Sequence, residues 1–505
     1  MADVLLFFLA LVPIVGLILA LGVFQVPAHW ATPAAWVVTG VLALVFWQLD
    51  PHRWLGATVE GVAFALWPIM LVIIAAIFTY HLAEETGSLK TIETMLTGIT
   101  TDKRIQVLIL AWGFGGFLEA VAGYGTAVAI PASILALLGF NPVFAAVISL
   151  IANTVPTAFG AVGIPVSTLA ALTGLEASKL SLAVALQLTP FIILVPFVLV
   201  FLTGGGFKAL KGVVGITLVA GVSFAIPQLL AAAFLGPELP ALLGSIVALV
   251  STIAWAKVFH HESAAPGGPR ISWRQGVLAW LPYLLILAVI LLASKLVPPV
   301  YGFLGQFKSS VVFWEGGKPV DFKWVATPGV LILFAAFVGA QIQGAKFSQI
   351  ARTFGKTLWK LRKSTLTVVS ILAMAKVMDA SGMISNLAQV LVAVTGGLYP
   401  LVAPMIGALG TFVTGSDTSS NVLFGKLQLT VAGQTGLDPY WLAAANTAGA
   451  TAGKMISPQS IAVATGATGL TGQEGKILQQ TFLFCLGYVL LLGVLVLVVS
   501  LAPSA

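Results

Sequence analysis

Long apolar segments separated by short polar connections dominate this chain. A helix needs roughly 20 apolar residues to cross about 30 Å of hydrocarbon. Segments of about that length predict membrane-spanning helices at residues 3–23, 31–48, 58–82, 178–203, 211–235, 239–258, 276–295, 326–343, 365–381 and 477–502.

Two further regions, 105–172 and 399–470, are apolar but interrupted by Gly, Pro, Asn, Ser and Thr. Non-helical backbone at membrane depth is tolerated only where it is buried in protein or lines a wet cavity. We therefore expect each region to hold a re-entrant hairpin, at 105–140 and 399–433, followed by a broken helix. Two full spans in place of each hairpin are the alternative.

The two interrupted regions resemble each other. "EETGSLKTIETMLTG" aligns with "DASGMISNLAQVLVA", and "GGFLEAVAGYG" aligns with "GTFVTGSDTSS". "ANTVPTAFGAVGIPVS" aligns with "ANTAGATAGKMISPQS". Matches in register over such a length indicate an internal repeat. We expect one membrane domain, 1–505, with repeat cores at 83–172 and 382–470.

Composition defines the class. Hydrophobic residues make up 59% of the 505 residues and charged residues 8%, with a mean hydropathy of +1.05. Soluble domains carry about 25% charged residues. The chain is therefore expected to be an all-α polytopic membrane protein.

Its first segment lacks a basic stretch and a cleavage site, so we expect a retained helix rather than a signal peptide. The single cysteine, Cys485, excludes an intramolecular disulfide.

The net charge of +7 does not indicate a nucleic-acid partner, because the basic residues gather in connections between apolar segments. Residues 345–364 contain six Lys or Arg and no acidic residue, which predicts a cytoplasmic loop. Counting spans from that loop, the two repeats enter the membrane from opposite faces. An inverted repeat with hairpins and broken helices is typical of secondary transporters.

Polar groups in the interrupted regions are the candidate site. The predicted hairpin tips are "AVAGYGTA" (120–127) and "GSDTSS" (415–420). Glycines allow tight turns, and the N–H groups at the start of a half-helix suit an anion. The pairs Asn153-Thr154 and Asn446-Thr447 are predicted to sit in unwound helix near the middle of the bilayer. Hydrogen bonding to a neighbouring helix is the alternative for these pairs. For "GATAG" (449–453), helix packing through small residues is the favoured interpretation.

Ionisable residues within apolar segments are costly and indicate function. Glu119 and Asp417 are candidates to carry a proton. Lys454 is either a counter-charge for a carboxylate substrate or a side chain that reaches the membrane interface. Lys376 and Asp379, three residues apart, are predicted to form an ion pair with each other.

No enzyme, cofactor or metal motif is found: there is no Walker A sequence, zinc-ligand spacing or serine nucleophile elbow. The histidines lie in predicted loops or at the ends of spans. Transport driven by an ion gradient is the favoured function. A passive anion channel and a sodium-coupled symporter remain open, and a membrane-embedded enzyme lacks any catalytic set of residues.

The sequences "GGFLEAVAGYGTAVAIP", "IANTVPTAFGAVGIPVS", "FVTGSDTSSNVLFGKLQ" and "AANTAGATAGKMISPQSIAVA" closely resemble the bacterial L-lactate permease family over most of the chain. The resemblance implies a cytoplasmic-membrane symporter of L-lactate, glycolate and related monocarboxylates with protons. It also implies alternating access by an elevator-like motion. It says nothing of the oligomeric state.

The family's polar positions carry over to this chain as a set. The substrate-binding candidates are Gly123, Tyr124, Gly125, Thr126, Asn153, Thr154, Ser416, Thr418, Ser419, Asn421, Asn446, Thr447, Lys454 and Ser457, with Asp417 and Glu119 for proton coupling. Tyr124 replaces an expected phenylalanine, and the pairing of Lys376 with Asp379 is not typical of the family.

Overall fold

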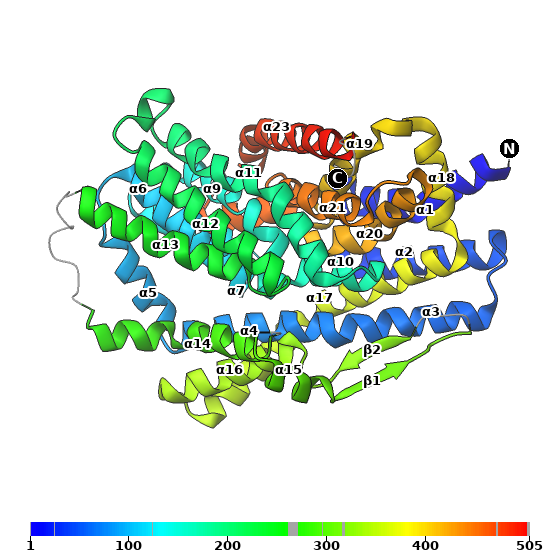
Figure 1. Cartoon of the computed structure of the whole chain (residues 1–505), viewed down its shortest axis with the longest axis horizontal. Coiled ribbons are helices and arrows are strands. Elements are labelled where there is room, and N and C mark those ends of the chain that lie inside the picture. The colour runs from blue at the N-terminus through cyan, green and yellow to red at the C-terminus, as the bar shows by residue number, and fades with distance from the viewer. Residues whose placement is uncertain are drawn as a thin grey trace.

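The computed structural model describes residues 2–24, 26–123, 125–260, 271–294, 296–315, 319–470 and 473–501. Within these residues, 11 helices are long and apolar enough to cross a membrane. Most of the helices run side by side along the long axis of the molecule (Figure 1). Each of the ten predicted spans coincides with a helix or with consecutive helices. They are α1 (Ala2–Ile18) with the π-helical turn Leu19–Val23, α2 (Ala28–Phe46), α3 (Pro51–Phe64) and α4 (Leu71–Glu85) joined by Ala65–Met70, α11 (Ala177–Thr203), α12 (Val214–Phe234), α13 (Pro240–Phe259), α14 (Trp273–Leu292), α16 (Pro328–Ile342), α17 (Phe347–Ser381) and α23 (Glu474–Leu501).

The basic segment 345–364 is not a loop. Nearly all of it belongs to α17, which continues without interruption into the predicted span 365–381. The segment consists mostly of helix-forming residues, and Gly355 is its only glycine. The exposed basic face and the membrane span therefore form one long helix.

The predicted connection 296–325 contains structure of its own. It forms α15 (Pro298–Gly305) and an antiparallel pair of strands, β1 (Lys308–Val311) and β2 (Val320–Lys323), with Val311 opposite Val320. Trp314, between the strands, donates from Nε1 to Glu60 Oε2 on α3 at 2.9 Å. This bond ties the hairpin to the helices. Most of the other predicted connection, 259–275, lies outside the described residues.

The predicted ion pair between Lys376 and Asp379 is wrong. Lys376 Nζ lies 2.5 Å from Glu60 Oε1 on α3, and Asp379 Oδ2 lies 3.4 Å from Lys426 Nζ on α20 (Asp417–Thr435). A partially buried ammonium and a carboxylate on adjacent helices can meet in better geometry than two side chains on one helix turn. Both charges thus connect α17 to different neighbours.

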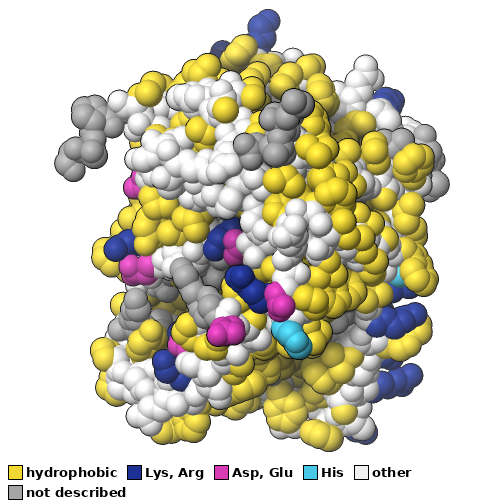
Figure 2. All heavy atoms as spheres, turned by 90° about the vertical axis from the view of Figure 1, so that its right-hand side faces the viewer, with side chains coloured by type: hydrophobic (Ala, Val, Ile, Leu, Met, Phe, Trp, Pro, Cys, Tyr) yellow, Lys and Arg dark blue, Asp and Glu magenta, His cyan; other side chains and the backbone are white. Residues whose placement is uncertain are grey.

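The end of the bundle carries mixed charge. Figure 2 shows this end, with Lys, Arg, Asp and Glu side chains gathered near its centre and left, and hydrophobic side chains over much of its right-hand part. Large apolar side chains are also exposed along the helices, among them Phe8, Leu194, Val250 and Leu491. An exposed apolar surface of this kind fits a lipid environment.

Both repeats have the same order of elements. A left-handed glycine, Gly87 or Gly382, precedes a short helix, α5 (Ser88–Thr97) or α18 (Met383–Thr395). A helical hairpin follows. The first is made by α6 (Lys103–Val107), the π-helical stretch Leu108–Phe114, α7 (Gly115–Val121) and α8 (Thr126–Leu137), and the second by α19 (Tyr399–Thr414) and α20.

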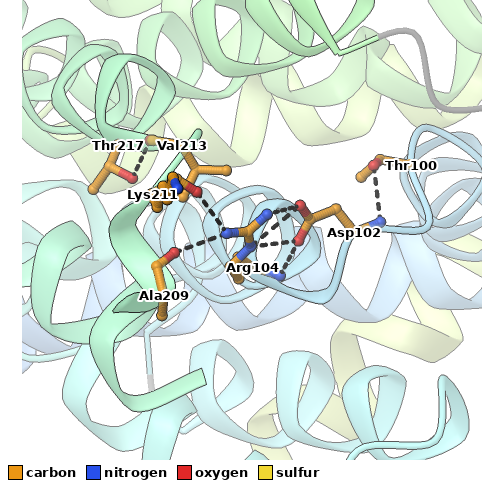
Figure 3. A network of polar contacts seen from close by, with 7 residues as sticks. All are labelled: Thr100, Asp102, Arg104, Ala209, Lys211, Val213 and Thr217. Carbon is orange, nitrogen blue, oxygen red and sulfur yellow. Dashed lines mark hydrogen bonds and ion pairs between the residues drawn. The ribbon is translucent and has the colours of Figure 1, made fainter. Parts of the chain in front are cut away.

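The root of the first hairpin is fixed to the turn before α12. Arg104 on α6 donates from Nη1 to the carbonyl oxygens of Ala209 and Lys211 at 2.8 and 3.1 Å, and its guanidinium also pairs with Asp102 (Figure 3). Burial alone would raise the pKa of Asp102, but hydrogen bonds from Arg104 hold this pKa below its usual value. The base of the hairpin is therefore anchored, while its tip reaches into the bundle.

Small residues let the second hairpin pack directly on α21 (Pro439–Lys454). A Cβ atom on Gly407, Gly449 or Gly453 would overlap backbone of the opposite helix: Asn446 for the first, Pro404 and Ala408 for the others. The packing interpretation of "GATAG" is thereby confirmed. Close backbone contact through small residues is a common way for membrane helices to associate.

We predict that Gly449→Ala destabilises the protein by about 1–3 kcal/mol, because the added methyl group overlaps the Pro404 carbonyl. Thermal unfolding in detergent measures the change. Gly433→Ala, on α20 with no heavy atom near the new methyl group, is the matched control and should be neutral or slightly stabilising. Equal melting temperatures for both variants would contradict the packing argument.

Candidate functional site

The tip of the first hairpin is built from glycines. After α7 ends at Val121, Gly123 and Gly125 adopt φ angles of +61° and +86° and α8 begins at Thr126. Only glycine takes these angles without strain, so the chain can reverse within a few residues. The Thr126 hydroxyl donates to the Gly123 carbonyl at 2.8 Å. Tyr124 lies outside the described residues.

The tip of the second hairpin is built differently. Gly415, with φ +72°, ends α19, and Ser416 caps α20 by accepting from the Ser419 N–H at 3.2 Å. Asp417 is the first residue of α20, where a carboxylate is favoured by the helix dipole. The polar stretch in the apolar second repeat is therefore a helix start within the bundle.

The first broken helix unwinds where the sequence predicts. α9 (Pro142–Ala152) stops before Asn153, a 3₁₀ turn covers Val155–Phe159, and α10 (Gly160–Thr173) follows. Its first residues are irregular, since Ala161, Val162 and Gly163 all have positive φ angles. A Cβ atom on Gly163 would overlap the Pro237 carbonyl, so glycine is required at that point.

The second broken helix is interrupted later than predicted. α21 runs unbroken through Asn446 and Thr447 to Lys454, and the break falls between Lys454 and Pro458, where α22 (Pro458–Thr468) begins. The small residues around Asn446 favour close packing on α19, which keeps the helix regular. Proline at position 458 then starts a new helix instead of continuing the old one.

A cavity of about 100 Å³ lies between the two hairpin tips and the two breaks. It is large enough for several water molecules or one small organic acid, and smaller than the ~300–1,000 Å³ of sites for drug-sized ligands. The cavity is lined by Glu119, Gly123, Gly125, Thr157, Gly160, Ala161, Ile164, Pro165, Gly415, Ser416, Asp417, Thr418, Lys454, Gln459, Ser460 and Val463.

A buried ion pair crosses the cavity. Lys454 Nζ lies 2.7 Å from Glu119 Oε1 and 3.3 Å from the Thr157 hydroxyl. The side chains of Lys454 and Glu119 are only 10% and 3% exposed. Lys454 therefore faces the site and does not extend to the membrane interface. The pair joins the first hairpin to the second broken helix, 335 residues apart in sequence.

Polar side chains support the second tip from behind. Thr447 donates to Asp417 Oδ1 at 2.9 Å, and Asn421 donates to Thr447 at 2.7 Å. Asn446 in turn donates to Asn421 Oδ1 at 2.9 Å. Asn421 also donates to the Pro165 carbonyl at 3.1 Å, so the network reaches α10. A buried network with paired members makes a specific, rigid arrangement.

Several buried acceptors at the site have no hydrogen-bond partner among the described residues. They are Glu119 Oε2, Asp417 Oδ2, Asn153 Oδ1 and Ser457 Oγ. Burying an acceptor without a partner costs free energy, so unpaired atoms here indicate a place for a ligand, water or proton. Within the described chain, no three His, Cys, Asp or Glu side chains come together as a metal site.

The structure brings some of the predicted residues to the cavity and leaves others behind it. The lining residues among them are Glu119, Gly123, Gly125, Ser416, Asp417, Thr418 and Lys454. The predicted residues that do not line it are Thr126, Asn153, Thr154, Ser419, Asn421, Asn446, Thr447 and Ser457. The Thr154 hydroxyl donates a hydrogen bond to the Leu150 carbonyl oxygen in its own helix turn. Their part in binding stays a prediction.

Sequence reasoning missed the residues that follow each break. Ile164 and Ala161 come from the irregular start of α10, and Gln459 and Val463 from the first turns of α22. Pro165 follows the irregular first residues of α10 and aligns with Pro458, the first residue of α22, so this alignment could have indicated these positions. Apolar side chains give no signal of a site in an apolar chain.

A larger cavity of about 420 Å³ is also lined in part by residues of α10. Ile164 lines both cavities, and Val162 and Glu238 line the larger one. Burial raises the pKa of the Glu238 carboxyl to about 7, against a hydrogen bond from its own backbone and the charge of Lys323. Ile164, directly after the left-handed segment Ala161–Gly163, is thus shared by the linings of the two cavities.

Inverted repeats, paired hairpins, broken helices and a small buried site between them define a multi-pass membrane transporter. The chain belongs to the L-lactate permease family, whose model matches residues 6–502. It is 48% identical to the L-lactate permease of Streptococcus iniae, covering 86% of this chain and 93% of that protein. It is 35% identical to the L-lactate permease of Bacillus subtilis (96% and 94% covered) and 34% identical to a glycolate permease of Escherichia coli (97% and 94% covered).

Two solved transporters share the fold. The YdaH transporter of Alcanivorax borkumensis matches with a TM-score of 0.51 at 14% identity, covering 92% of this chain and 98% of that one. MtrF of Neisseria gonorrhoeae matches with a TM-score of 0.52 at 14% identity, covering 94% and 97%. The expected fold class is confirmed: an all-α membrane protein with inverted repeats.

We predict that Lys454→Met destabilises the protein by about 3–5 kcal/mol, because it leaves the Glu119 carboxylate buried and unpaired. The double variant Glu119→Gln/Lys454→Met should recover much of that loss. Unfolding in detergent measures both. Glu176→Gln, in the exposed pair with Lys179, is the control and should cost less than about 1 kcal/mol. A Lys454→Met protein as stable as the wild type would show that the pair does not form.

Proposed function

We propose that this protein is a secondary active transporter that imports L-lactate, and related 2-hydroxy monocarboxylates such as glycolate, together with protons. The proposed location is the cytoplasmic membrane of a bacterium. The names of the relatives support the substrate class. The observation that carries the proposal is the cavity itself, which places two buried carboxylates beside one buried lysine.

Charge balance supports coupling to a proton. With Glu119 and Asp417 ionised and Lys454 protonated, the site already holds one excess negative charge. A carboxylate substrate adds another, and uncompensated charge in a buried site is costly. A proton on Asp417 or Glu119 cancels the charge that the substrate adds, and each carboxylate has an oxygen without a partner among the described residues. Substrate and proton would then bind together.

Lys454 is the proposed counter-charge for the substrate carboxylate. Two of its three donors already reach Glu119 and Thr157. A substrate carboxylate would take the remaining donor, or replace Glu119, which could then accept the proton. N–H groups and hydroxyls at Ser416 and Thr418 would complete the anion site.

We also propose that residues 83–172 and 382–470 act as the transporting core. All the residues that line the small cavity lie within these two ranges. The long helices outside them, such as α17, would form the frame. We propose that the core moves past this frame in an elevator-like motion, because the cavity belongs to the core alone.

The test is uptake by purified protein in liposomes, with proton and sodium gradients set independently. We expect an inward proton gradient to drive accumulation of labelled L-lactate, without any dependence on sodium. Asp417→Asn should reduce proton-driven accumulation at least tenfold. The control is Asp438→Asn, which changes an exposed cap at the opposite end of α21 from Lys454.

Other outcomes would identify the alternatives. Accumulation driven by sodium at fixed pH would replace the proton with sodium as the coupling ion. Downhill flux alone, without accumulation under either gradient, would indicate a channel. Normal accumulation by Asp417→Asn would remove Asp417 from the coupling step.

A further inference from the structure

α22 contacts both hairpin tips from the side of the cavity. Gln459 packs against Gly415 at the second tip, where a Cβ atom would overlap its side chain. Val463 packs against Gly125 at the first tip, where a Cβ atom would lie 3.0 Å from a Val463 methyl group. Residues four apart lie on the same helix face. One face of α22 therefore spans the site.

That face changes from polar to apolar along the helix. Gln459 and Ser460 lie in the first turn, and Val463 lies one turn further, all three lining the cavity. The start of the helix also holds Ser457, which is fully buried and whose hydroxyl has no partner among the described residues. A small ligand alongside this face would meet polar groups at one end and a methyl surface at the other.

The rest of the cavity is mostly polar. Apart from Val463, its apolar side chains are Ala161, Ile164 and Pro165, all from the first broken helix. Ile164 also lines the larger cavity, so a change there would alter both cavities. Val463 is not in the lining of the larger cavity, so a change there alters the smaller cavity alone of the two.

We propose that Val463 sets the preference among 2-hydroxy monocarboxylates by contacting the substituent on carbon 2. This inference rests on the proposed transport of such acids. Their carboxylate and hydroxyl groups need hydrogen bonds, and these are available around Lys454, Ser416 and the start of α22. The substituent, a methyl group in lactate and a hydrogen atom in glycolate, then occupies the apolar end beside Val463.

The test compares two variants of opposite size. Val463→Leu adds a methylene group to a cavity of about 100 Å³ and should exclude the methyl group of lactate. We expect its uptake efficiency for L-lactate to fall at least about tenfold, since one methylene in a pocket discriminates by roughly 10–200-fold. Its efficiency for glycolate should change by less than about threefold. Val463→Ala should raise uptake of 2-hydroxybutyrate relative to lactate, because it enlarges the apolar end.

The matched control is Val494→Leu, the same substitution at a half-exposed position on α23. It should leave both efficiencies unchanged. Equal changes for lactate and glycolate in both Val463 variants would overturn the inference while leaving the transport function in place. Val463→Ala decides the question if Val463→Leu fails to fold. Failure of the wild-type protein to take up any of these acids would instead reject the proposed function.

Discussion

The buried ion pair between Glu119 and Lys454 is the interaction on which the site depends. Neither charge could stay in the middle of an apolar bundle without the other, because removing an ion from water costs several kcal/mol. Their separation of 2.7 Å fixes the first hairpin against the second broken helix. The two repeats are thereby joined across the cavity, and everything that lines it is positioned relative to this contact.

Backbone packing and polar bonding work together around the pair. Glycines on α19 and α21 bring these helices close enough for Asn446 and Thr447 to reach α20. The close packing of α21 on α19 also keeps α21 regular as far as Lys454. The lysine therefore lies at the end of a rigid helix. The first repeat reaches the equivalent place by a different route, with positive φ angles at Ala161 and Val162 instead of a new helix that starts at a proline, Pro458. The repeats share an order of elements but not a chemistry.

Much of the fold could be predicted from the sequence. Membrane spans follow from hydrophobic length, and the hairpins follow from the repeat and from glycines at 123, 125 and 415. Tertiary contacts could not be predicted. Lys376 and Asp379 are adjacent on one helix, yet their partners Glu60 and Lys426 come from elsewhere in the chain. The sequence predicts the second break too early, at Asn446, because asparagine is a weak helix former, whereas this side chain is satisfied by hydrogen bonds to Asn421 and Gln428 on α20. Val463 carried no signal, since valine is ordinary in an apolar chain.

The long sequence separation of the ion pair has a consequence for biosynthesis. Glu119 enters the membrane early, when the residue that neutralises it is still 335 residues from being added to the chain. During that interval the first repeat must hold a carboxyl group without its lysine, and the second tip cannot yet close the cavity. The small cavity is consequently one of the last features of the nascent protein to form, after nearly all of its membrane helices have been made.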